Sequence, residues 1–192
     1  MKIDLSNDER KKMASRIAIY TDGACTKNGK KDARGGIGIH CPEGFLPEVS
    51  ERLPEVECAT NNRAELFAIY VAIVLADMIG RSRKTDYAIV IYSDSEYAVN
   101  CVTKWVSSWK KRNFTTTAGG KVKNVDLICA IDKLLEKTKL KVDIVSILGH
   151  GKEPLAIHSE GNEVADVLAK KGSFKEKVKD LFVDLMKSCA CD

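Results

Sequence analysis

Two short apolar runs in this sequence each end in an aspartate. Ile17–Thr21 leads into Asp22, and Ala88–Ser93 leads into Asp94. The second run shows no polar alternation, which is typical of a strand buried on both faces of a sheet. In open α/β sheets, ligands bind beyond the carboxyl ends of the strands. The sequence therefore predicts an α/β fold with two acids at one edge of its sheet.

The remaining hydrophobic pattern predicts strands and helices that build one domain. Three short strands separated by turn-rich loops open the domain as an antiparallel unit, and later strands add in parallel. The expected strands cover residues 16–22, 35–41, 49–53, 87–92 and 141–148. The expected helices cover residues 60–80, 95–111, 124–138 and 161–171. The predicted fold class is α/β, with a mixed five-stranded sheet flanked by helices.

Two segments flank the predicted domain, which we place at residues 16–172. Residues 1–15 are polar and lack an apolar period, so we expect a leader or linker. Residues 173–192 form an amphipathic C-terminal extension, either an additional helix or a prolongation of the helix before it. The apolar positions of this extension are Phe174, Val178, Leu181, Phe182 and Leu185.

Two further acids stand near the beginnings of predicted helices. Glu65 lies at the start of the long helix, and Asp166 lies early in the helix over residues 161–171. Together with Asp22 and Asp94 they make four carboxylates that can converge on one sheet edge. Converging carboxylates repel one another unless cations lie among them, and hard divalent cations prefer carboxylate oxygens. The alternative for each acid alone is ordinary turn or helix-start chemistry.

Positive charge is concentrated in two segments. The 31 Lys+Arg and 27 Asp+Glu residues leave a net charge of +4, which would say little if it were evenly spread. One basic loop contains Lys27, Lys30, Lys31 and Arg34. The second contains Lys104, Lys110, Lys111, Arg112, Lys121 and Lys123. Beside an acidic cluster, these patches indicate a polyanionic ligand, although each alone could be a solvated loop.

Cysteine usage and hydropathy exclude several classes of protein. Seven cysteines without a repeated CxxC spacing argue against a zinc or disulfide framework, and for a reducing intracellular compartment: nucleus, cytoplasm or an organelle. The longest apolar stretch, Leu66–Ile79, is interrupted by Asp77 and is too short to span a membrane. We expect core positions for Cys25, Cys101 and Cys129, and exposed thiols at a loose terminus for Cys189 and Cys191.

Four short motifs carry a resemblance to a known family. They are Tyr20-Thr-Asp-Gly-Ala24, Thr60-Asn-Asn-Arg-Ala-Glu65, Tyr92-Ser-Asp-Ser95 and Gly161-Asn-Glu-Val-Ala-Asp-Val-Leu-Ala169. In order and spacing they resemble the four acidic motifs of type 1 ribonuclease H over roughly residues 16–172. The resemblance implies the ribonuclease H-like fold. It also implies an endonuclease that cuts the RNA strand of RNA–DNA hybrids and leaves 5′-phosphate and 3′-hydroxyl ends.

The same resemblance implies a cofactor, two Mg²⁺ ions for which Mn²⁺ can substitute. It implies that Asp22 bridges both ions, that Glu65 and Asp94 complete the site of the ion at the leaving group, and that Asp166 serves the ion that activates water. Two cations about 3.5–4 Å apart suit phosphodiester hydrolysis because they provide a nucleophilic hydroxide and relieve charge on the leaving oxygen.

Three histidines differ in their expected roles. His150 matches the family histidine that follows the last strand, so it is the candidate for relaying a proton or releasing product. Residues 151–160 form a longer segment than the family pattern has, and His158 within it is the rival candidate or a plain loop histidine. His40 lies within a predicted strand and is expected to be structural.

The nucleic-acid contacts are likewise implied by the resemblance. Three asparagines can bond ribose 2′-hydroxyls or serve as turn and cap residues, namely Asn28, Asn61 and Asn62. Residues 104–123 resemble a basic protrusion whose cations are Lys110, Lys111, Arg112 and Lys121. The expected DNA contacts are Thr60, Trp105, Trp109, Phe114, Thr117 and Asn124, with the two tryptophans alternatively in the core. The family often has an arginine just before the Thr-Asn pair, where this chain has Cys58-Ala59.

We therefore interpret the chain as a ribonuclease H catalytic domain that binds the hybrid duplex as a monomer, with no obligate protein partner and no membrane contact. One alternative is the ribonuclease H domain of a retroelement reverse transcriptase. A polymerase region would decide for that alternative, and these residues contain none. The other alternative is a catalytically silent hybrid-binding module, against which the four intact acids argue.

Overall fold

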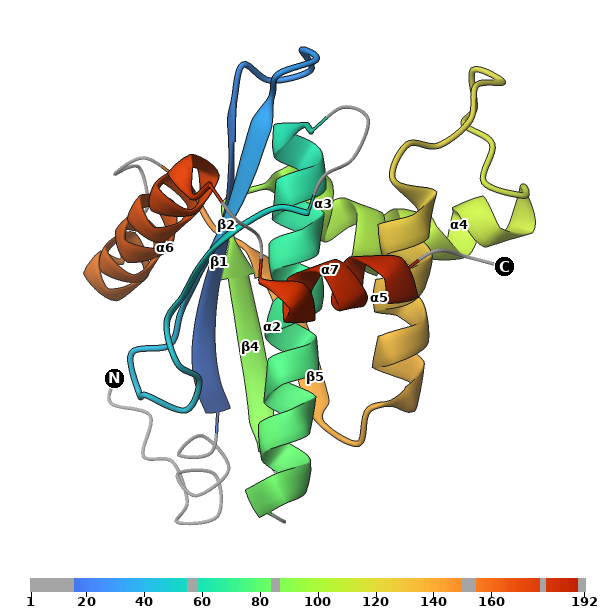
Figure 1. Ribbon diagram of the computed structural model, residues 1–192. Coiled ribbons are helices and arrows are strands. Elements are labelled where there is room, and N and C mark those ends of the chain that lie inside the picture. The colour runs from blue at the N-terminus through green and yellow to red at the C-terminus, as the bar shows by residue number, and fades with distance from the viewer. Residues whose placement is uncertain (1–15, 55–58, 84–86, 150–154, 177–178, 190–192) are drawn as a thin grey trace.

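The sheet of the protein is mixed and contains five strands in the order β3-β2-β1-β4-β5 (Figure 1). The computed structural model describes residues 16–54, 59–83, 87–149, 155–176 and 179–189. The strands are β1 (Arg16–Thr26), β2 (Arg34–His40), β3 (Val49–Arg52), β4 (Ala88–Ser93) and β5 (Lys141–Ser146). The pairs β1–β2 and β2–β3 are antiparallel, whereas β1–β4 and β4–β5 are parallel. The expected fold class is confirmed.

Helices cover both faces of this sheet (Figure 1). They are α2 (Asn61–Arg83), α3 (Glu96–Asn100), the π-helix η1 (Cys101–Trp105), α4 (Val106–Lys111), α5 (Val125–Lys137), α6 (Ala156–Phe174) and α7 (Asp180–Ser188). Helix α6 packs on β1, β2 and β3 from one side, while α2 packs on β1 and β2 from the other and also contacts α5. Among the described helices, none has the length and apolar character that crossing a bilayer would require.

Helix α2 begins at a side-chain cap and fills the core with its middle turns. The Thr60 hydroxyl accepts a hydrogen bond from the Arg63 backbone N–H at 3.2 Å, which satisfies one of the unpaired donors at the helix start. Phe67 and Ile73 are completely buried, as are Ile19 and Ile91 on the strands below. This burial on both sides explains why β4 reads as a continuous apolar run.

Helix α6 lies unusually close to β2 because two glycines leave room for it. A Cβ on Gly36 would stand 2.2 Å from the carbonyl oxygen of Ala169, and one on Gly38 would stand 1.9 Å from that of Ala165. Real Cβ atoms do not approach backbone so closely, so any larger residue would push the helix outward. The two glycines thereby fix the distance of Asp166, on the same helix, from the sheet.

Several predicted elements have different limits in the structure. Helix α6 begins at Ala156, five residues before the expected start, and continues through Phe174, so the expected domain boundary after residue 172 falls inside it. The expected helix over 95–111 is divided by the π-helix η1. Helix α7 is a separate element that lies across α2 (Figure 1).

The terminal thiols are only partly as expected. Cys189 is 2% exposed and donates a hydrogen bond to the Leu185 carbonyl, so the prediction of an exposed thiol was wrong there. Helix α7 packs back on the domain through Phe182, and Ser188 shares a hydrogen bond with Tyr70 of α2. Tertiary packing of the extension therefore buries a residue that its terminal position suggested was loose. Cys191 lies outside the described residues.

Candidate active site

Asp22 and Asp94 stand side by side at the sheet edge because of the register between two parallel strands. Tyr20 of β1 pairs with Tyr92 of β4, and their rings stack with centroids 5.2 Å apart. Two residues beyond this pair come Asp22, within β1, and Asp94, directly after the end of β4. This is the arrangement predicted from the two apolar runs that each end in an acid.

Glu65 reaches the same place from the first turns of α2. Gly23, next to Asp22, allows this approach, since a Cβ there would lie 2.2 Å from the Glu65 backbone nitrogen. Carboxylate oxygens of Asp22, Glu65 and Asp94 all lie within 4.8 Å of one another. Three of the four predicted carboxylates thus form one cluster, contributed by two strands and a helix.

The electrostatics of the cluster favour protonation in the absence of a cation. Burial, followed by the charges of Asp94 and Asp166, raises the pKa of Asp22 from 3.8 to about 7. Burial, together with the charges of Asp22 and Asp94, raises the pKa of Glu65 well above its usual value. Both effects penalise the ionised form, which a bound cation would favour instead.

Asp166 lines the same site but is not one of the three clustered carboxylates. Its Oδ2 accepts a hydrogen bond from Lys170 Nζ at 2.7 Å, one turn along α6. It is nonetheless near enough for its charge to raise the pKa of Asp22. Lys170 was missed by the sequence reasoning, although its spacing of four residues from Asp166 on a helix could have revealed the pair.

Two polar atoms in the site support a fit to divalent cations. Glu65 Oε2 is buried and has no hydrogen-bond partner among the described residues, which is costly unless something else satisfies it. Asn162 donates from Nδ2 to Asp94 Oδ2 at 3.1 Å and so orients that carboxylate. A set of oxygen donors with an unsatisfied buried carboxylate oxygen fits Mg²⁺ or Mn²⁺. Asn162 was also missed, although it stands inside the last quoted motif.

The carboxylates lie in an open groove of about 840 Å³. Its floor comes from β1 and from the segments that follow β4 and β5, and one wall comes from α6. The described lining residues include Asp22, Asn61, Glu65, Asp94, Leu148, Asp166, Lys170 and Phe174. Because the groove is partly open to solvent, it can admit part of a polymer rather than only a small molecule.

The three histidines have different surroundings. His158 lies in the first turn of α6, where its Nδ1 is 2.9 Å from the Tyr20 hydroxyl and its ring is 4.3 Å from that of Tyr92. It is not among the described residues that line the groove. His40 is the last residue of β2, and its Nδ1 lies 3.1 Å from Glu48 Oε1, which is consistent with a structural role. His150 lies outside the described residues.

The expected RNA-contacting asparagines lie beside the cluster. Asn28 Oδ1 accepts a hydrogen bond from the Asn61 backbone N–H at 3.0 Å, which ties the β1–β2 loop to the start of α2. Asn61 lines the groove, and both Asn28 and Asn62 are exposed. Asn28 therefore has a structural role at the start of α2, as the turn and cap alternative predicted, while the side chains of Asn61 and Asn62 face solvent.

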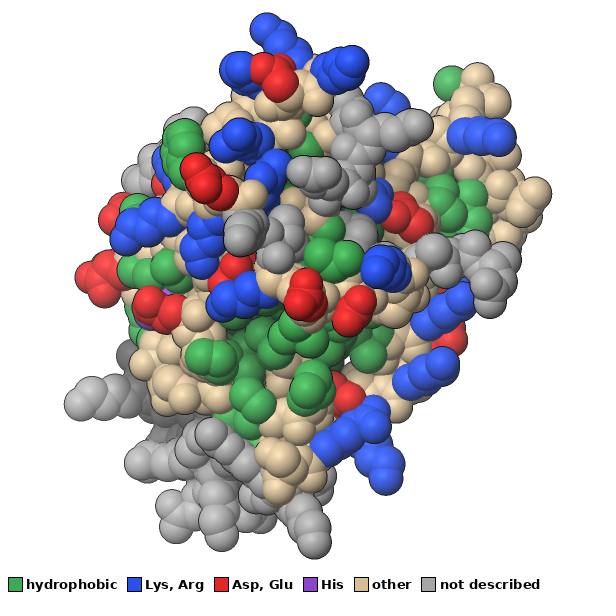
Figure 2. All heavy atoms as spheres, in the orientation of Figure 1, with side chains coloured by type: hydrophobic (Ala, Val, Ile, Leu, Met, Phe, Trp, Pro, Cys, Tyr) green, Lys and Arg blue, Asp and Glu red, His purple; other side chains and the backbone are tan. Residues whose placement is uncertain are grey.

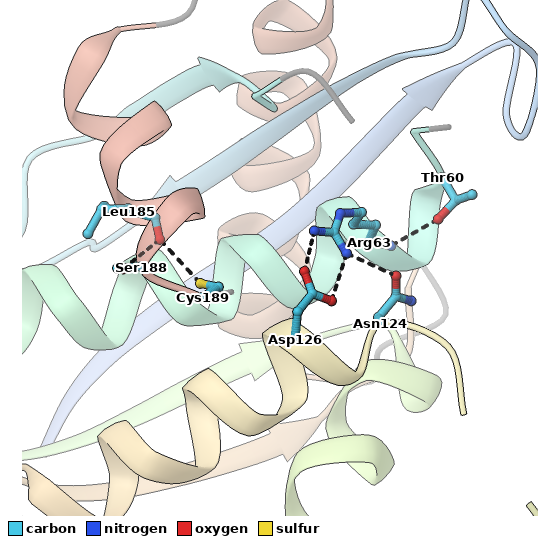
Figure 3. A network of polar contacts seen from close by, with 7 residues as sticks. All are labelled: Thr60, Arg63, Asn124, Asp126, Leu185, Ser188 and Cys189. Atoms are coloured by element: carbon cyan, nitrogen blue, oxygen red, sulfur yellow. Dashed lines mark hydrogen bonds and ion pairs between the residues drawn. The ribbon is translucent and has the colours of Figure 1, made fainter. Parts of the chain in front are cut away.

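Two of the expected DNA contacts, Thr60 and Asn124, meet in a polar network with Arg63 (Figure 3). Arg63 donates to both carboxylate oxygens of Asp126, at 3.0 and 2.5 Å, and to Asn124 Oδ1 at 3.4 Å. Burial alone would raise the pKa of Asp126, but the Arg63 hydrogen bonds and charge lower it. The network holds Thr60, which caps α2, close to Asn124, which precedes α5. Arg63 is a third residue that the sequence reasoning missed. Cys58 lies outside the described residues.

The basic protrusion follows α4 and closes through a bridge between Thr115 and Lys121. Trp105 is 38% exposed, whereas Trp109 and Phe114 are half-buried and pack against the core. Lys110 bonds to Asp132 and, at 3.2 Å, to Glu136 of α5. Of the four expected cations, Lys110 is therefore already ion-paired, whereas Lys111, Arg112 and Lys121 are exposed. Thr117, an expected DNA contact in the same loop, is also exposed.

Positive charge also gathers on the loop between β1 and β2, at the top of the view in Figure 2. Its exposed cations are Lys27, Lys30, Lys31 and Arg34, and Lys27 pairs with Asp32. Because this loop follows the strand that carries Asp22, the positive charge lies beyond the acidic end of the sheet. A polyanion in the groove would meet acids at the centre and cations outside it.

The strand order of the sheet and the carboxylate cluster at its edge together place the protein in the class of ribonuclease H-like folds. The PFV RNase H domain, solved in solution, superposes with a TM-score of 0.61 at 24% sequence identity, over 82% of this chain and 94% of that chain. At this identity the likeness shows the fold. The RNase H family description matches residues 14–174.

The chain belongs to the RNase H family, within which it is a type 1 ribonuclease H. It is 35% identical over 169 residues to Ribonuclease H1 of Mus musculus, covering 88% of this chain and 54% of that protein. It is also 35% identical over 169 residues to Ribonuclease HI of Haemophilus influenzae, covering 88% of this chain and 97% of that protein. The chain therefore spans about half the length of the mammalian relative and nearly all of the bacterial one.

Proposed function

We propose that the protein hydrolyses the RNA strand of RNA–DNA hybrids, leaving 5′-phosphate and 3′-hydroxyl ends. The observation that carries this function is the cluster of Asp22, Glu65 and Asp94, with oxygens within 4.8 Å, in a chain of the RNase H family. When bound, a pair of Mg²⁺ or Mn²⁺ ions supplies water activation and charge stabilisation for phosphodiester hydrolysis. The catalytic domain extends to the end of α6 at Phe174, two residues beyond the expected limit, and the active form is an intracellular monomer.

Some residues of the site would bind the cations, and others orient the carboxylates that bind them. Asp22, Glu65 and Asp94 hold the cations, with Asn162 keeping the Asp94 carboxylate in place. Asp166 would be the fourth carboxylate to hold them, and its partner Lys170 would offer an ammonium group to a phosphate oxygen. Except for Asp94, which directly follows β4, each of these groups comes from a helix or strand, which keeps the site preorganised.

We assign the proton transfer to His150, which follows the groove-lining Gly149 in the sequence. The rival, His158, is engaged with Tyr20 and Tyr92, which suits an anchor of the first turn of α6. Replacing His150 by Ala should slow turnover without abolishing it, while His158→Ala should mainly lower thermal stability. The opposite pattern would assign the proton transfer to His158.

The hybrid duplex is held on both sides of the cleaved phosphate. Asn28, Asn61 and Asn62 bond ribose 2′-hydroxyls of the RNA strand. Thr60, Asn124 and Thr117 hold a DNA phosphate, with Arg63 positioning the first two, and Trp105, Trp109 and Phe114 pack against deoxyriboses. The bacterial relative is matched over 97% of its length, so a reverse transcriptase parent is not required to explain the chain. Four intact acids argue against a silent hybrid-binding module.

A substrate panel tests this function. Four labelled substrates of one sequence, an RNA–DNA hybrid, single-stranded RNA, duplex RNA and duplex DNA, are incubated with the purified protein in Mg²⁺ and in EDTA. Only the RNA strand of the hybrid should be cut, only with Mg²⁺, and the products should carry 5′-phosphate ends. Equal cleavage of duplex RNA, or cleavage in EDTA, would overturn the assignment.

A further inference from the structure

One wall of the groove carries three unlike side chains in a single stripe along α6. Asp166, Lys170 and Phe174 follow one another at intervals of four residues, and all three line the groove. Residues four apart on a helix lie on one face, one above the next. The stripe therefore presents a carboxylate, an ammonium group and an aromatic ring in order, away from the acidic cluster.

Phe174 is conspicuous at the end of this stripe because its ring is 70% exposed. It has the highest exposed fraction of the large apolar side chains that are exposed in the described part of the chain. Folding gains little from a phenyl ring left in water, since hydrophobic stabilisation follows the apolar area that is buried. A single exposed apolar residue needs no explanation by itself. Phe174 differs from such a residue because it lines the groove that holds the carboxylates.

The backbone that carries Phe174 is held firmly by its neighbours. Gly172 lies so close to β3 that a Cβ there would be 2.5 Å from the Glu51 carbonyl oxygen. Ser173 is 1% exposed and donates from its hydroxyl to the Lys170 carbonyl at 2.7 Å. Lys175 donates to Glu51 Oε1 at 3.1 Å. The two residues before Phe174 are thus buried and the one after it is ion-paired, so the ring projects from a fixed support.

We propose that Phe174 packs against the sugar–phosphate backbone of the RNA strand, a few nucleotides from the cleaved phosphate, and acts as a positioning residue for that strand. Eight residues of helix separate it from Asp166, which is about 12 Å of rise. At the roughly 3.4 Å axial rise per nucleotide of a duplex strand, this distance corresponds to about three or four nucleotides. The contact is with the strand being cut, and it therefore rests on the proposed hybrid cleavage.

The chemistry of a duplex favours the ribose as the contact. Bases in a duplex are stacked on one another, whereas the wide minor groove of A-form nucleic acid displays the ribose and its 2′-hydroxyl. An aromatic ring offers a large, rigid contact area at low entropic cost. Lys170, one turn before Phe174, is bonded to Asp166 in this structure and supplies a cation for a phosphate of this strand once that carboxylate releases it.

Photo-crosslinking tests the contact directly. The photoreactive amino acid p-benzoylphenylalanine replaces Phe174 in the full chain, in an Asp22→Asn background that leaves the strand uncut. Hybrids labelled on either the RNA or the DNA strand are irradiated in Mg²⁺. The matched control carries the same group in place of Val167, which is 47% exposed on α6 but lines a different hollow with Glu163 and Lys171. We expect crosslinks to the RNA strand from position 174 and none from position 167.

Binding measurements separate positioning from stability. Phe174→Ala should weaken binding of the hybrid by roughly fivefold, the lower end of the range for stacked aromatic contacts, and raise KM with kcat and Tm unchanged. Val167→Ala should change none of these. Crosslinks only to DNA, equal crosslinks from both positions, or none although the hybrid binds, would overturn the role of Phe174 alone. Failure of the parent protein to bind or cut the hybrid would overturn the proposed function as well.

Discussion

At the residue scale, Asp22 controls how the stability of the metal-free protein depends on pH. Its pKa is raised from 3.8 to about 7, so the folded protein binds a proton more tightly than the unfolded chain does. A group with a raised folded-state pKa loses stability as pH rises between the two values, here from about 4 to about 7. The metal-free protein should therefore be less stable at pH 8 than at pH 5 as far as this carboxyl contributes.

Asp22→Asn should remove this penalty. At pH 8 in EDTA, the variant should be more stable than the parent by on the order of 2–4 kcal/mol, or about 5–15 °C in Tm for a chain of this size. At pH 4 the advantage should be small, because the parent carboxyl is then protonated. Thermal unfolding at both pH values measures the difference, with Asp180→Asn, an exposed carboxylate at the start of α7, as the control. A variant that is destabilised equally at both pH values would contradict the electrostatic origin.

At the element scale, the approach of α6 to the sheet sets the geometry of Asp166 and Asn162. Gly38→Ala would place a methyl group 1.9 Å from the Ala165 carbonyl, where only backbone movement gives relief. We expect a loss of stability of about 3 kcal/mol or more. Gly120→Ala is the control, because the nearest atom to its added Cβ would be the Thr116 hydroxyl oxygen, at 3.6 Å. Urea unfolding compares them, and equal losses would rule out the close approach as the cause.

Helix α7 is an element whose contribution is to stability rather than to chemistry. Phe182 is 4% exposed beneath it and Leu181 is 49% exposed on it. Phe182→Ala should cost roughly 2–4 kcal/mol, while Leu181→Ala should cost less than about 0.5 kcal/mol. None of the described residues of α7 lines the groove, so kcat should stay unchanged in both variants. A fall in kcat for Phe182→Ala at a temperature where it is folded would connect α7 to the site.

Sequence patterns anticipated what is local and missed what depends on packing. Apolar runs that end in acids are local signals, so the strands and the meeting of Asp22 with Asp94 could be predicted. The early start of α6 could not, because residues 151–160 lack an apolar period. The burial of Cys189 depends on α7 folding back over α2. Likewise, the pairing of Lys110 with α5 joins segments that sequence spacing does not relate.

At the scale of the whole molecule, the basic protrusion should govern affinity rather than chemistry. Each lost phosphate contact should flatten the log–log salt dependence of hybrid binding by about 0.9. Replacing Lys111, Arg112 and Lys121 by Ala should therefore lower the slope by up to about 2.7 and raise KM. Lys110→Ala should do less, since Lys110 is already ion-paired. Single-turnover cleavage at saturation should stay the same.

The matched control for the protrusion is Lys141→Ala, at the start of β5 and at the opposite end of the sheet from the acids. Its salt slope should equal that of the parent. Equal slopes for the triple variant and the parent would show that the protrusion is a solvated loop that makes no phosphate contacts.

The most direct test of the account is cleavage of the RNA strand of a hybrid by the parent protein and by Asp22→Asn, under single-turnover conditions, with Mg²⁺ and with EDTA. Asp22 lies at the centre of the carboxylate cluster, and its replacement by an isosteric amide changes charge with little change in shape. The account predicts cleavage by the parent in Mg²⁺ only, and no detectable cleavage by the variant, although the variant binds the hybrid at least as tightly. A variant that cuts at a rate close to that of the parent would contradict the assignment of the site.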